Sequence, residues 1–299
     1  MPQLLNTPGD QVTQDGQIQY GGLLMGETTE YVGEQLTGWD DLPDMDTATV
    51  LRPTQHGGWP GHLLAGTRTL QWDFMILPDS QERFPALLAE LRRATAPTQR
   101  EQDLVVQLAG ARRLMRGRVT RRALPADRRY TRGEPYGSVV WECSDPRRYE
   151  TQENRVTCGL PAPEPGLDWT DGGLDYPLEW GVTGSTGTLV APNLGEAPAH
   201  PIVEFRGPVV RPSLLQLHTG RRLEYDITLT ASDVLRVDCA DGTAVLNSTA
   251  SRLYAVTARS VPEQTFTFDP GVSVLAFRAA PGTYDPLASV TVRWRSAFW

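Results

Sequence analysis

Lysine is missing from this chain of 299 residues, and cysteine and histidine are scarce. All 28 basic residues are Arg, and 36 acidic residues bring the net charge to −8. The acidic balance argues against general nucleic-acid binding, whose affinity comes from clustered cations. The three Cys form neither a CxxC pair nor an even set, which argues against a zinc knuckle and a disulfide framework. Reduced, structural thiols are the favoured interpretation.

Long hydrophobic runs and catalytic motifs are also missing. No stretch approaches the roughly 18 to 20 apolar residues of a membrane helix, and the first residues lack the regions of a signal peptide, so we expect synthesis in a cytoplasm. The motifs HExxH and GxSxG, a Walker loop, an EF-hand loop and a dinucleotide-binding GxGxxG are absent. His56 and His62 share a Gly-rich loop without further metal ligands nearby. We therefore predict no enzyme, no metal and no cofactor.

Short alternating runs between Gly- and Pro-rich connections indicate a mainly β protein. In 70–76 the even positions are apolar, and in 223–229 the odd positions are, which is the period of a half-buried strand. Further strands are expected at 103–108, 117–121, 138–143, 202–205, 234–238, 265–268, 274–278 and 290–294. This spacing is typical of sandwiches and barrels.

One helix is predicted in the first half. Its apolar residues at helical spacing are Phe84, Leu87, Leu88 and Leu91. Asp79 or Ser80 is expected to cap its start, and Pro97 to close its far end. A stretch rich in Pro and Gly follows Tyr149, so we divide the chain into domains at 1–150 and 151–299.

Charge is distributed unevenly along the chain. Residues 1–50 hold nine acids and no base, whereas 100–148 hold twelve Arg and six acids. GC-rich coding explains the use of Arg in place of Lys most simply; the alternative is planar Arg–carboxylate pairs at an extensive interface. The asymmetry favours self-association of an acidic segment with a basic one.

The aromatic residues separate into two groups. Trp72, Trp141 and Trp294 fall on alternating strands and are expected in the core. Trp59, Trp169 and Trp180 fall in loops and are the candidates for facing a ligand such as a sugar ring. The apolar terminus 297–299 is expected to be packed, because loose ends rarely finish on two large aromatics.

Four segments, at 36–43, 143–149, 191–212 and 269–275, carry a recognisable pattern. Its residues are Gly38, Trp39, Asp40, Asp145, Pro146, Arg147, Tyr149, Asn193, Gly195, Pro201, Gly207, Pro208, Pro270 and Gly271. In order and spacing they resemble the distal tail protein (Dit) family of siphovirus-type phage tail components. The specificity lies in the ordered set and its spacing, which span nearly the whole chain.

The resemblance implies a ring-forming N-terminal domain, a small β-barrel or sandwich with one α-helix, and a galectin-like C-terminal β-sandwich. It implies a structural virion protein made in the host bacterial cytoplasm and placed at the distal end of the tail. There a homohexameric ring would join the tail tube to the tail tip or baseplate. Implied partners are the tail tube protein, the tail tip hub protein and a receptor-binding protein, while DNA passes through the ring without specific binding and no membrane is involved.

Alternatives remain open at this point. The C-terminal half is also compatible with a carbohydrate-binding module for host-surface adhesion, and the particle with a tailocin or a gene transfer agent. A cell-wall hydrolase is disfavoured, since no paired acid and base and no metal triad is visible. Within the ring, we expect the acidic block 10–46 to line the opening and the Arg-rich stretch to meet neighbouring subunits.

Overall fold

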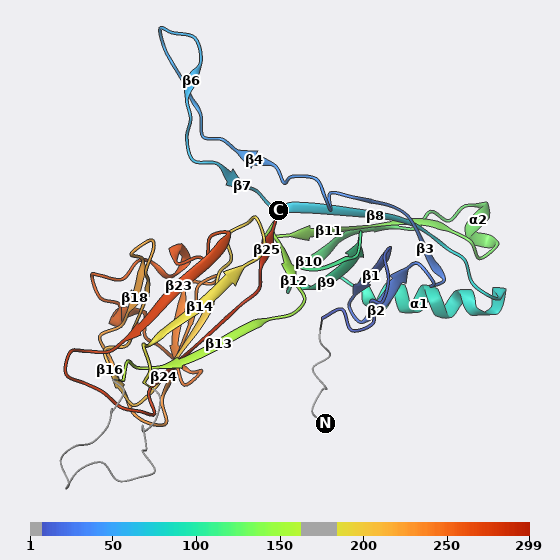
Figure 1. The fold of residues 1–299 in the computed structure, drawn as a ribbon. Helices are drawn as coiled ribbons and strands as arrows, with labels where there is room; N and C mark the ends of the chain where they lie inside the picture. Colours follow the sequence, from blue (N-terminus) through green and yellow to red (C-terminus); the bar gives the residue numbers. More distant parts are fainter. Residues whose placement is uncertain (1–7, 163–183) are drawn as a thin grey trace. The chain divides into compact units, whose positions relative to one another are not determined.

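The computed structural model describes residues 8–162 and 184–299 (Figure 1). The chain divides into two compact units, an N-terminal unit of Met1–Thr151 with Phe298–Trp299 and a C-terminal unit of Gln152–Ala297. Strands dominate both units and one long helix is present in the described part, so the mainly β class predicted from the sequence is confirmed.

One antiparallel sheet forms the body of the N-terminal unit, in the order β2-β1-β9-β10-β11-β8-β3. The strands are β1 (Gln17–Tyr20), β2 (Leu23–Gly26), β3 (Tyr31–Thr37), β8 (Arg68–Ile76), β9 (Gln102–Leu108), β10 (Ala111–Ala123) and β11 (Tyr136–Cys143). A short strand, β12 (Arg148–Glu150), pairs with β10. Alternation along β8 places Leu70, Trp72 and Phe74 in the core, as the sequence predicted.

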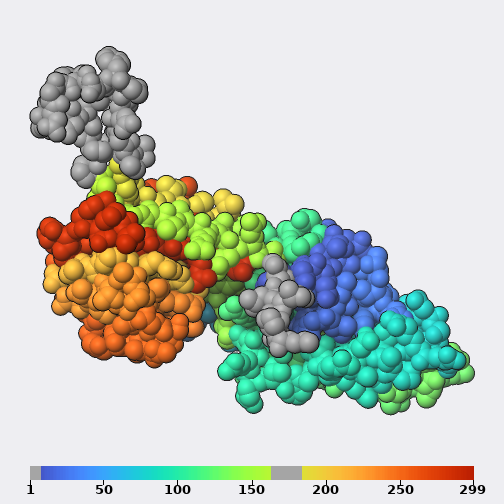
Figure 2. Space-filling model, turned by 90° about the horizontal axis from the view of Figure 1, so that it is seen from below, coloured from blue at the N-terminus to red at the C-terminus, as the bar shows by residue number. Residues whose placement is uncertain are grey.

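The helix α1 (Phe84–Ala94) contributes its apolar stripe to the same core. Pro85 lies in its first turn, where a missing N–H costs nothing. The predicted caps are wrong: a 3-10 turn, η1 (Gln81–Arg83), precedes α1, and Ser80 makes no side-chain capping bond. In Figure 2 the cyan residues that include α1 lie directly beside the blue residues of the first strands.

A second, four-residue helix, α2 (Arg128–Thr131), was not predicted. Asp127 caps it, since its carboxylate accepts from the backbone N–H groups of Arg129 and Tyr130 at 2.9 Å each.

A long two-stranded arm, residues 38–67, joins β3 to β8 and extends from the end of that strand pair (Figure 1). Two short ladders hold it together. They are formed by β4 (Met45–Asp46) with β7 (Leu64–Ala65) and by β5 (Val50–Leu51) with β6 (Gly58–Trp59).

The C-terminal unit contains two larger antiparallel sheets. The first has the order β13-β24-β15-β20-β21-β22 and the second β14-β23-β17-β18. Their strands are β13 (Asn154–Gly159), β14 (Thr188–Asn193), β15 (Ile202–Arg206), β17 (Ser213–Gln216), β18 (Arg222–Glu224), β20 (Val234–Asp238), β21 (Thr243–Leu246), β22 (Ala250–Ser251), β23 (Gly271–Arg278) and β24 (Ser289–Trp294). Smaller elements are β16 (Val209–Val210), β19 (Thr228–Leu229), η2 (Leu253–Ala255) and η3 (Glu263–Thr265). The last strand, β25 (Ala297–Phe298), pairs with β12.

Two predicted strands of this unit are wrong. The run 223–229 is divided between β18 and β19, because Tyr225 instead bridges to Val256 and the Asp226 N–H donates to the Ala255 carbonyl at 2.7 Å. The segment 265–268 is not a strand either: η3 ends at Thr265, and only Phe268 forms an isolated bridge, to Ala199.

Candidate functional site

Most of the exposed apolar surface of the N-terminal unit lies on the arm. The large apolar side chains exposed there are Leu42, Val50, Leu51, Trp59, Leu63 and Leu64. Leu77 is the only other such residue in the described part of this unit. Because a two-stranded ribbon is marginally stable in water by itself, an arm of this composition is suited to being covered by another surface.

The arm starts at a fixed turn. Arg68, the first residue of β8, is 2% exposed, and its Nη1 donates to the carbonyl oxygens of Gly38 at 3.1 Å and Trp39 at 2.7 Å. Gly38 has φ +86°, and a Cβ there would lie 2.2 Å from the Thr69 carbonyl oxygen. Burial, together with the nearby Arg148 charge, lowers the pKa of Arg68. These contacts fix how the chain leaves β3.

Arg148 joins two of the signature segments. Its guanidinium forms an ion pair with Asp40 and lies over the Trp39 ring, 5.7 Å from the centroid. It also donates to the main-chain oxygen of Trp299, while Arg113 lies 3.8 Å from the ring centroid of Phe298. The expected packing is thus observed for Phe298 and Trp299, within the N-terminal unit.

The signature segment 145–149 closes on itself. The Asp145 carboxylate accepts from the backbone N–H of Arg147 at 3.1 Å, from its Nε at 2.7 Å and from the Tyr149 hydroxyl at 2.6 Å. Burial alone would raise the pKa of Asp145, but the hydrogen bonds and charge of Arg147 and the Tyr149 bond outweigh it and hold the pKa below its ordinary value. Pro146 lies inside this turn. The segment fixes the chain between β11 and β12.

Asn193 has the corresponding role in the C-terminal unit. Its Nδ2 donates to the carbonyl oxygens of Ala197 at 2.8 Å and Phe268 at 2.9 Å, and its Oδ1 accepts from the N–H groups of Gly195 and Ala297 at 3.2 Å each. The side chain is 2% exposed, and both its amide nitrogen and its amide oxygen form hydrogen bonds. One amide therefore binds three stretches of main chain, at 195–197, 268 and 297.

The remaining signature residues of this unit also serve close packing. A Cβ at Gly195 would lie 1.7 Å from the Ala297 carbonyl oxygen. Gly271 opens β23 directly opposite Asn193, after Pro270. The Pro201 carbonyl accepts from the Cys239 N–H at 3.1 Å, and the Gly207–Pro208 peptide is cis. These residues lie in turns and at strand ends, so the structure gives them a packing role.

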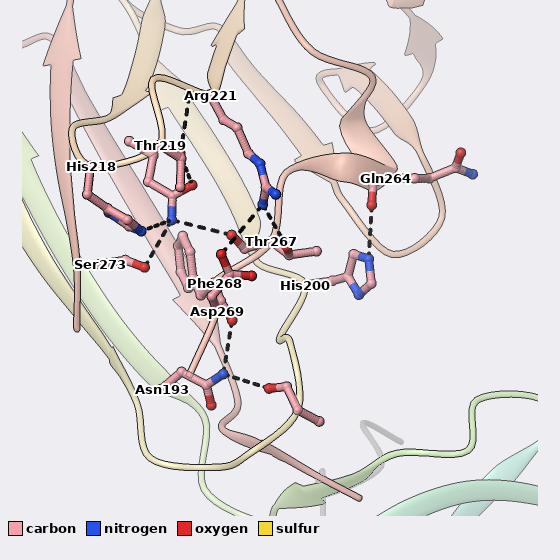
Figure 3. A network of polar contacts seen from close by, with 12 residues as sticks. Asn193, His200, His218, Thr219, Arg221, Gln264, Thr267, Phe268, Asp269 and Ser273 are labelled. Atoms are coloured by element: carbon pink, nitrogen blue, oxygen red, sulfur yellow. Dashed lines mark hydrogen bonds and ion pairs between the residues drawn. The ribbon is translucent and has the colours of Figure 1, made fainter. Parts of the chain in front are cut away.

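A polar network of side chains lies near Asn193 (Figure 3). Arg221 donates to the Thr267 hydroxyl at 3.2 Å and lies 3.9 Å from the Asp269 carboxylate. Gln216, fully buried, donates to the Ser273 hydroxyl at 3.1 Å. These groups bind one another and the main chain, which favours a structural role. Sugar binding by this unit stays a prediction.

Of the three aromatic residues predicted to face a ligand, one lies in the described part of the chain. Trp59 is exposed on the arm, with Arg52 5.5 Å from its ring centroid. Trp169 and Trp180 lie outside the described residues. The arm carries His56 and His62, and no group of three or more His, Cys, Asp or Glu that could hold a metal occurs among residues 8–162 and 184–299. None of the described helices has the length and apolar character to cross a membrane.

The cysteines are free thiols in the structure. Burial raises the pKa of the Cys143 thiol to about 12 and that of Cys158 to about 11. Thiols held protonated in this way are poor nucleophiles, which agrees with the structural role predicted for them.

Part of the C-terminal unit matches a known protein family. Residues 194–298 match the family model described as the C-terminal domain of siphovirus-type tail components. The resemblance to the Dit family predicted from the sequence is confirmed by this match and by the similarity of fold described next. No curated protein matches the chain.

Solved structures of tail components share the fold of the whole chain. The Dit protein of phage SPP1, described as a paradigm of the hub adsorption apparatus in phages that infect Gram-positive bacteria, is 12% identical, with a TM-score of 0.63 over 95% of this chain and 99% of that one. A chain of the phage P2 baseplate in its activated, Ca-bound conformation is 8% identical, with a TM-score of 0.50 over 93% and 96% of the two chains. At these identities the likeness shows the fold.

The arm and its exposed apolar side chains were not predicted from the sequence. The tail-component signature directed attention to Gly38, Trp39 and Asp40, and the structure shows that these residues form its root. The detectable signal was the apolar content of a segment rich in Gly and Pro, since Leu51, Leu63 and Leu64 flank turn residues without any neighbouring core strand.

Proposed function

We propose that this chain is the distal adaptor of a phage-type tail, six copies of which form a ring that joins the tail tube to the tail tip or baseplate. The observation that carries the proposal is that the fold match to SPP1 Dit extends over both units, together with the tail-component family match of residues 194–298. In this proposal the domain 1–150 forms the ring and the domain 151–299 is an outward galectin-like sandwich.

The proposed partners follow from an adaptor's position. They are further copies of the chain, the tail tube protein, the tip hub protein and a receptor-binding protein. The assembly would be completed at the distal end of the tail after synthesis in the host cytoplasm, and DNA would pass through the ring without specific binding. The proposed mechanism is structural and needs no cofactor.

The structure refines the charge proposal for the opening of the ring. The acidic block 10–46 is not one surface: Asp10, Asp15 and Glu27 lie on or near the strands β1 and β2, whereas the acids from Asp40 to Asp46 lie on the arm. We therefore restrict the proposed lumen lining to the first group, whose negative charge would repel phosphate.

Native mass spectrometry and negative-stain microscopy test the ring. The purified chain is measured alone and with the tail tube protein of the same particle, because a tube end can template closure. We expect a species of six chains of 33.0 kDa each and six-fold particles in at least one condition. Finding no six-chain species in either condition would refute the proposed function.

A further inference from the structure

The C-terminal unit has an apolar outer surface on one of its sheets. We call it the apolar face, and it consists of Val190, Leu215, Val272 and Val274. Val190 pairs directly opposite Val274 and is 52% exposed, and Val272 is 63% exposed. The alternate residues, such as Leu189 and Leu275, point into the core. The strands β14, β23 and β17 therefore carry apolar side chains on the outer side of the sheet as well as in the core.

The other sheet of the same unit shows that this is not a general property of the fold. Its outer side carries Arg155, Glu204, Arg236 and Arg293, and Arg293 bonds the Glu204 carboxylate at 2.7 Å. An antiparallel sheet that faces water normally has this polar outer side. The apolar face consequently has the character of a surface that meets another protein.

The arm has matching chemistry. Besides its apolar side chains it carries Asp41, Asp44 and Asp46, all exposed, and none of these forms an ion pair within the described residues. The edge of the apolar face carries Arg278, whose Nη1 donates only to carbonyl oxygens, at 2.7–3.3 Å, and has no carboxylate partner in the described part of the chain. The arm and the apolar face are thus complementary: both expose apolar side chains, and the arm carries acids without ion-pair partners where the edge of the apolar face carries a cation without one.

We propose that the arm of one copy docks on the apolar face of a second copy of this chain. The contact is heterologous, because it joins two different surfaces that every copy carries, and repetition by rotation closes such contacts into a ring. The proposal rests on the proposed function for the number of copies, and the docking itself is a separate claim. Arg68 and Gly38 fix the root, so the arm is held out and not folded back onto its own strands.

Two defective variants test the contact. The arm variant carries Leu51→Ser and Leu64→Ser, and the face variant carries Val190→Asp and Val272→Asp. All four positions are more than half exposed, so both variants should fold, which thermal melting checks. Matched controls are Leu77→Ser on the N-terminal unit and Arg155→Asp on the charged sheet. Self-association is measured by sedimentation and multi-angle light scattering at concentrations where the unchanged chain assembles.

We expect each variant alone to associate at least tenfold more weakly, and both controls to assemble like the unchanged chain. An equimolar mixture of the two variants has one intact junction, the arm of the face variant on the face of the arm variant. It should therefore give heterodimers in excess over homodimers of either variant, as a head-to-tail contact between these two surfaces requires.

Several results would overturn the docking. These are normal assembly of the face variant, no heterodimer in the mixture, or an unchanged chain that stays monomeric. Normal assembly of the face variant would mean that the arm docks on another surface. The absence of heterodimers in the mixture would also be the result if each arm covered a surface of its own chain. A six-chain ring that both variants still form would leave the proposed function standing and remove this inference. If the mixture gives heterodimers but the unchanged chain closes into a ring of a number other than six, the docking would stand and the proposed six-fold function would fail.

Discussion

Gly195 illustrates how a single hydrogen atom in place of a side chain sets the packing of the C-terminal unit. A Cβ there would lie 1.7 Å from the Ala297 carbonyl oxygen and 2.5 Å from its carbon, and both are main-chain atoms that cannot turn away. We expect Gly195→Ala to lower the free energy of unfolding of this unit by about 3 kcal/mol, the upper range for overpacking. Calorimetry or urea denaturation measures the change.

Gly159→Ala is the matched control in the same unit. The nearest atom to its Cβ would be the Ala288 carbonyl oxygen at 3.6 Å, an ordinary contact. We expect its effect to stay within about 0.5 kcal/mol, as for surface substitutions in general. Equal effects of the two substitutions would show that the close approach at Gly195 relaxes at little cost.

The Asp145 network predicts an acid dependence of the N-terminal unit. The folded-state pKa of Asp145 is lowered, so its stabilising contribution is complete above the unfolded pKa of about 3.9 and is lost as the pH falls through the folded pKa. Asp145→Asn should destabilise the unit at pH 7 and make its stability less dependent on pH below about 4. Urea denaturation between pH 7 and 2 measures both effects.

Asp10→Asn provides the comparison, because Asp10 is exposed and its carboxylate accepts only from the Gln19 amide, at 3.0 Å, among the bonds described. We expect that variant to follow the unchanged chain across the pH range. An Asp145→Asn variant with the acid profile of the unchanged chain would assign the acid sensitivity to other carboxylates.

At the scale of elements, the arm depends on its root. Gly38 and Gly57 both have φ +86°, but a Cβ at Gly38 meets the Thr69 carbonyl oxygen at 2.2 Å, whereas nothing lies within 4 Å at Gly57. An L-residue in this backbone region costs about 1–2 kcal/mol at either position. Gly38→Ala should cost about 3 kcal/mol in the N-terminal unit, because overpacking against β8 is added.

Hydrogen exchange separates the two glycine variants. In Gly38→Ala we expect faster exchange at the start of β8 and the end of β3, and in Gly57→Ala only near the tip of the arm. Unchanged protection of β8 in Gly38→Ala would mean that the turn does not hold the root.

Elements with a strong period were predictable from the sequence. The run 70–76 alternates cleanly and lies in β8, and the apolar residues predicted at helical spacing lie in α1. The run 223–229 has an equally clean alternation and is still divided, since the main chain at Tyr225 and Asp226 pairs instead with Val256 and Ala255. Long-range contacts of this kind override a local period.

The arm could not be predicted in the same way. Its ladders are two residues long on each side, which is too short to show alternation, and its apolar residues face no core of their own unit. The signature residues stay a prediction as a set, and their spacing could not show that Arg148, inside one segment, binds Asp40 in another. Pairings between distant segments exist only after folding.

At the scale of the whole molecule, each unit has its own buried core. In the C-terminal unit Phe205, Phe277 and Val292 are fully buried between strands of residues 152–297. A unit of this size that buries its own apolar surface is expected to fold alone. We therefore predict that a fragment of residues 152–297 is folded, with the far-ultraviolet dichroism of a β protein and a cooperative thermal transition.

The same fragment tests which unit carries assembly. It keeps the apolar face and lacks the arm, so it should stay monomeric by sedimentation at concentrations where the full chain associates. Added to the full chain, it should occupy arms without offering one, and thus shorten the assemblies in proportion to its concentration. A fragment that folds, stays monomeric and leaves assembly of the full chain unchanged would show that the C-terminal unit takes no part in joining copies.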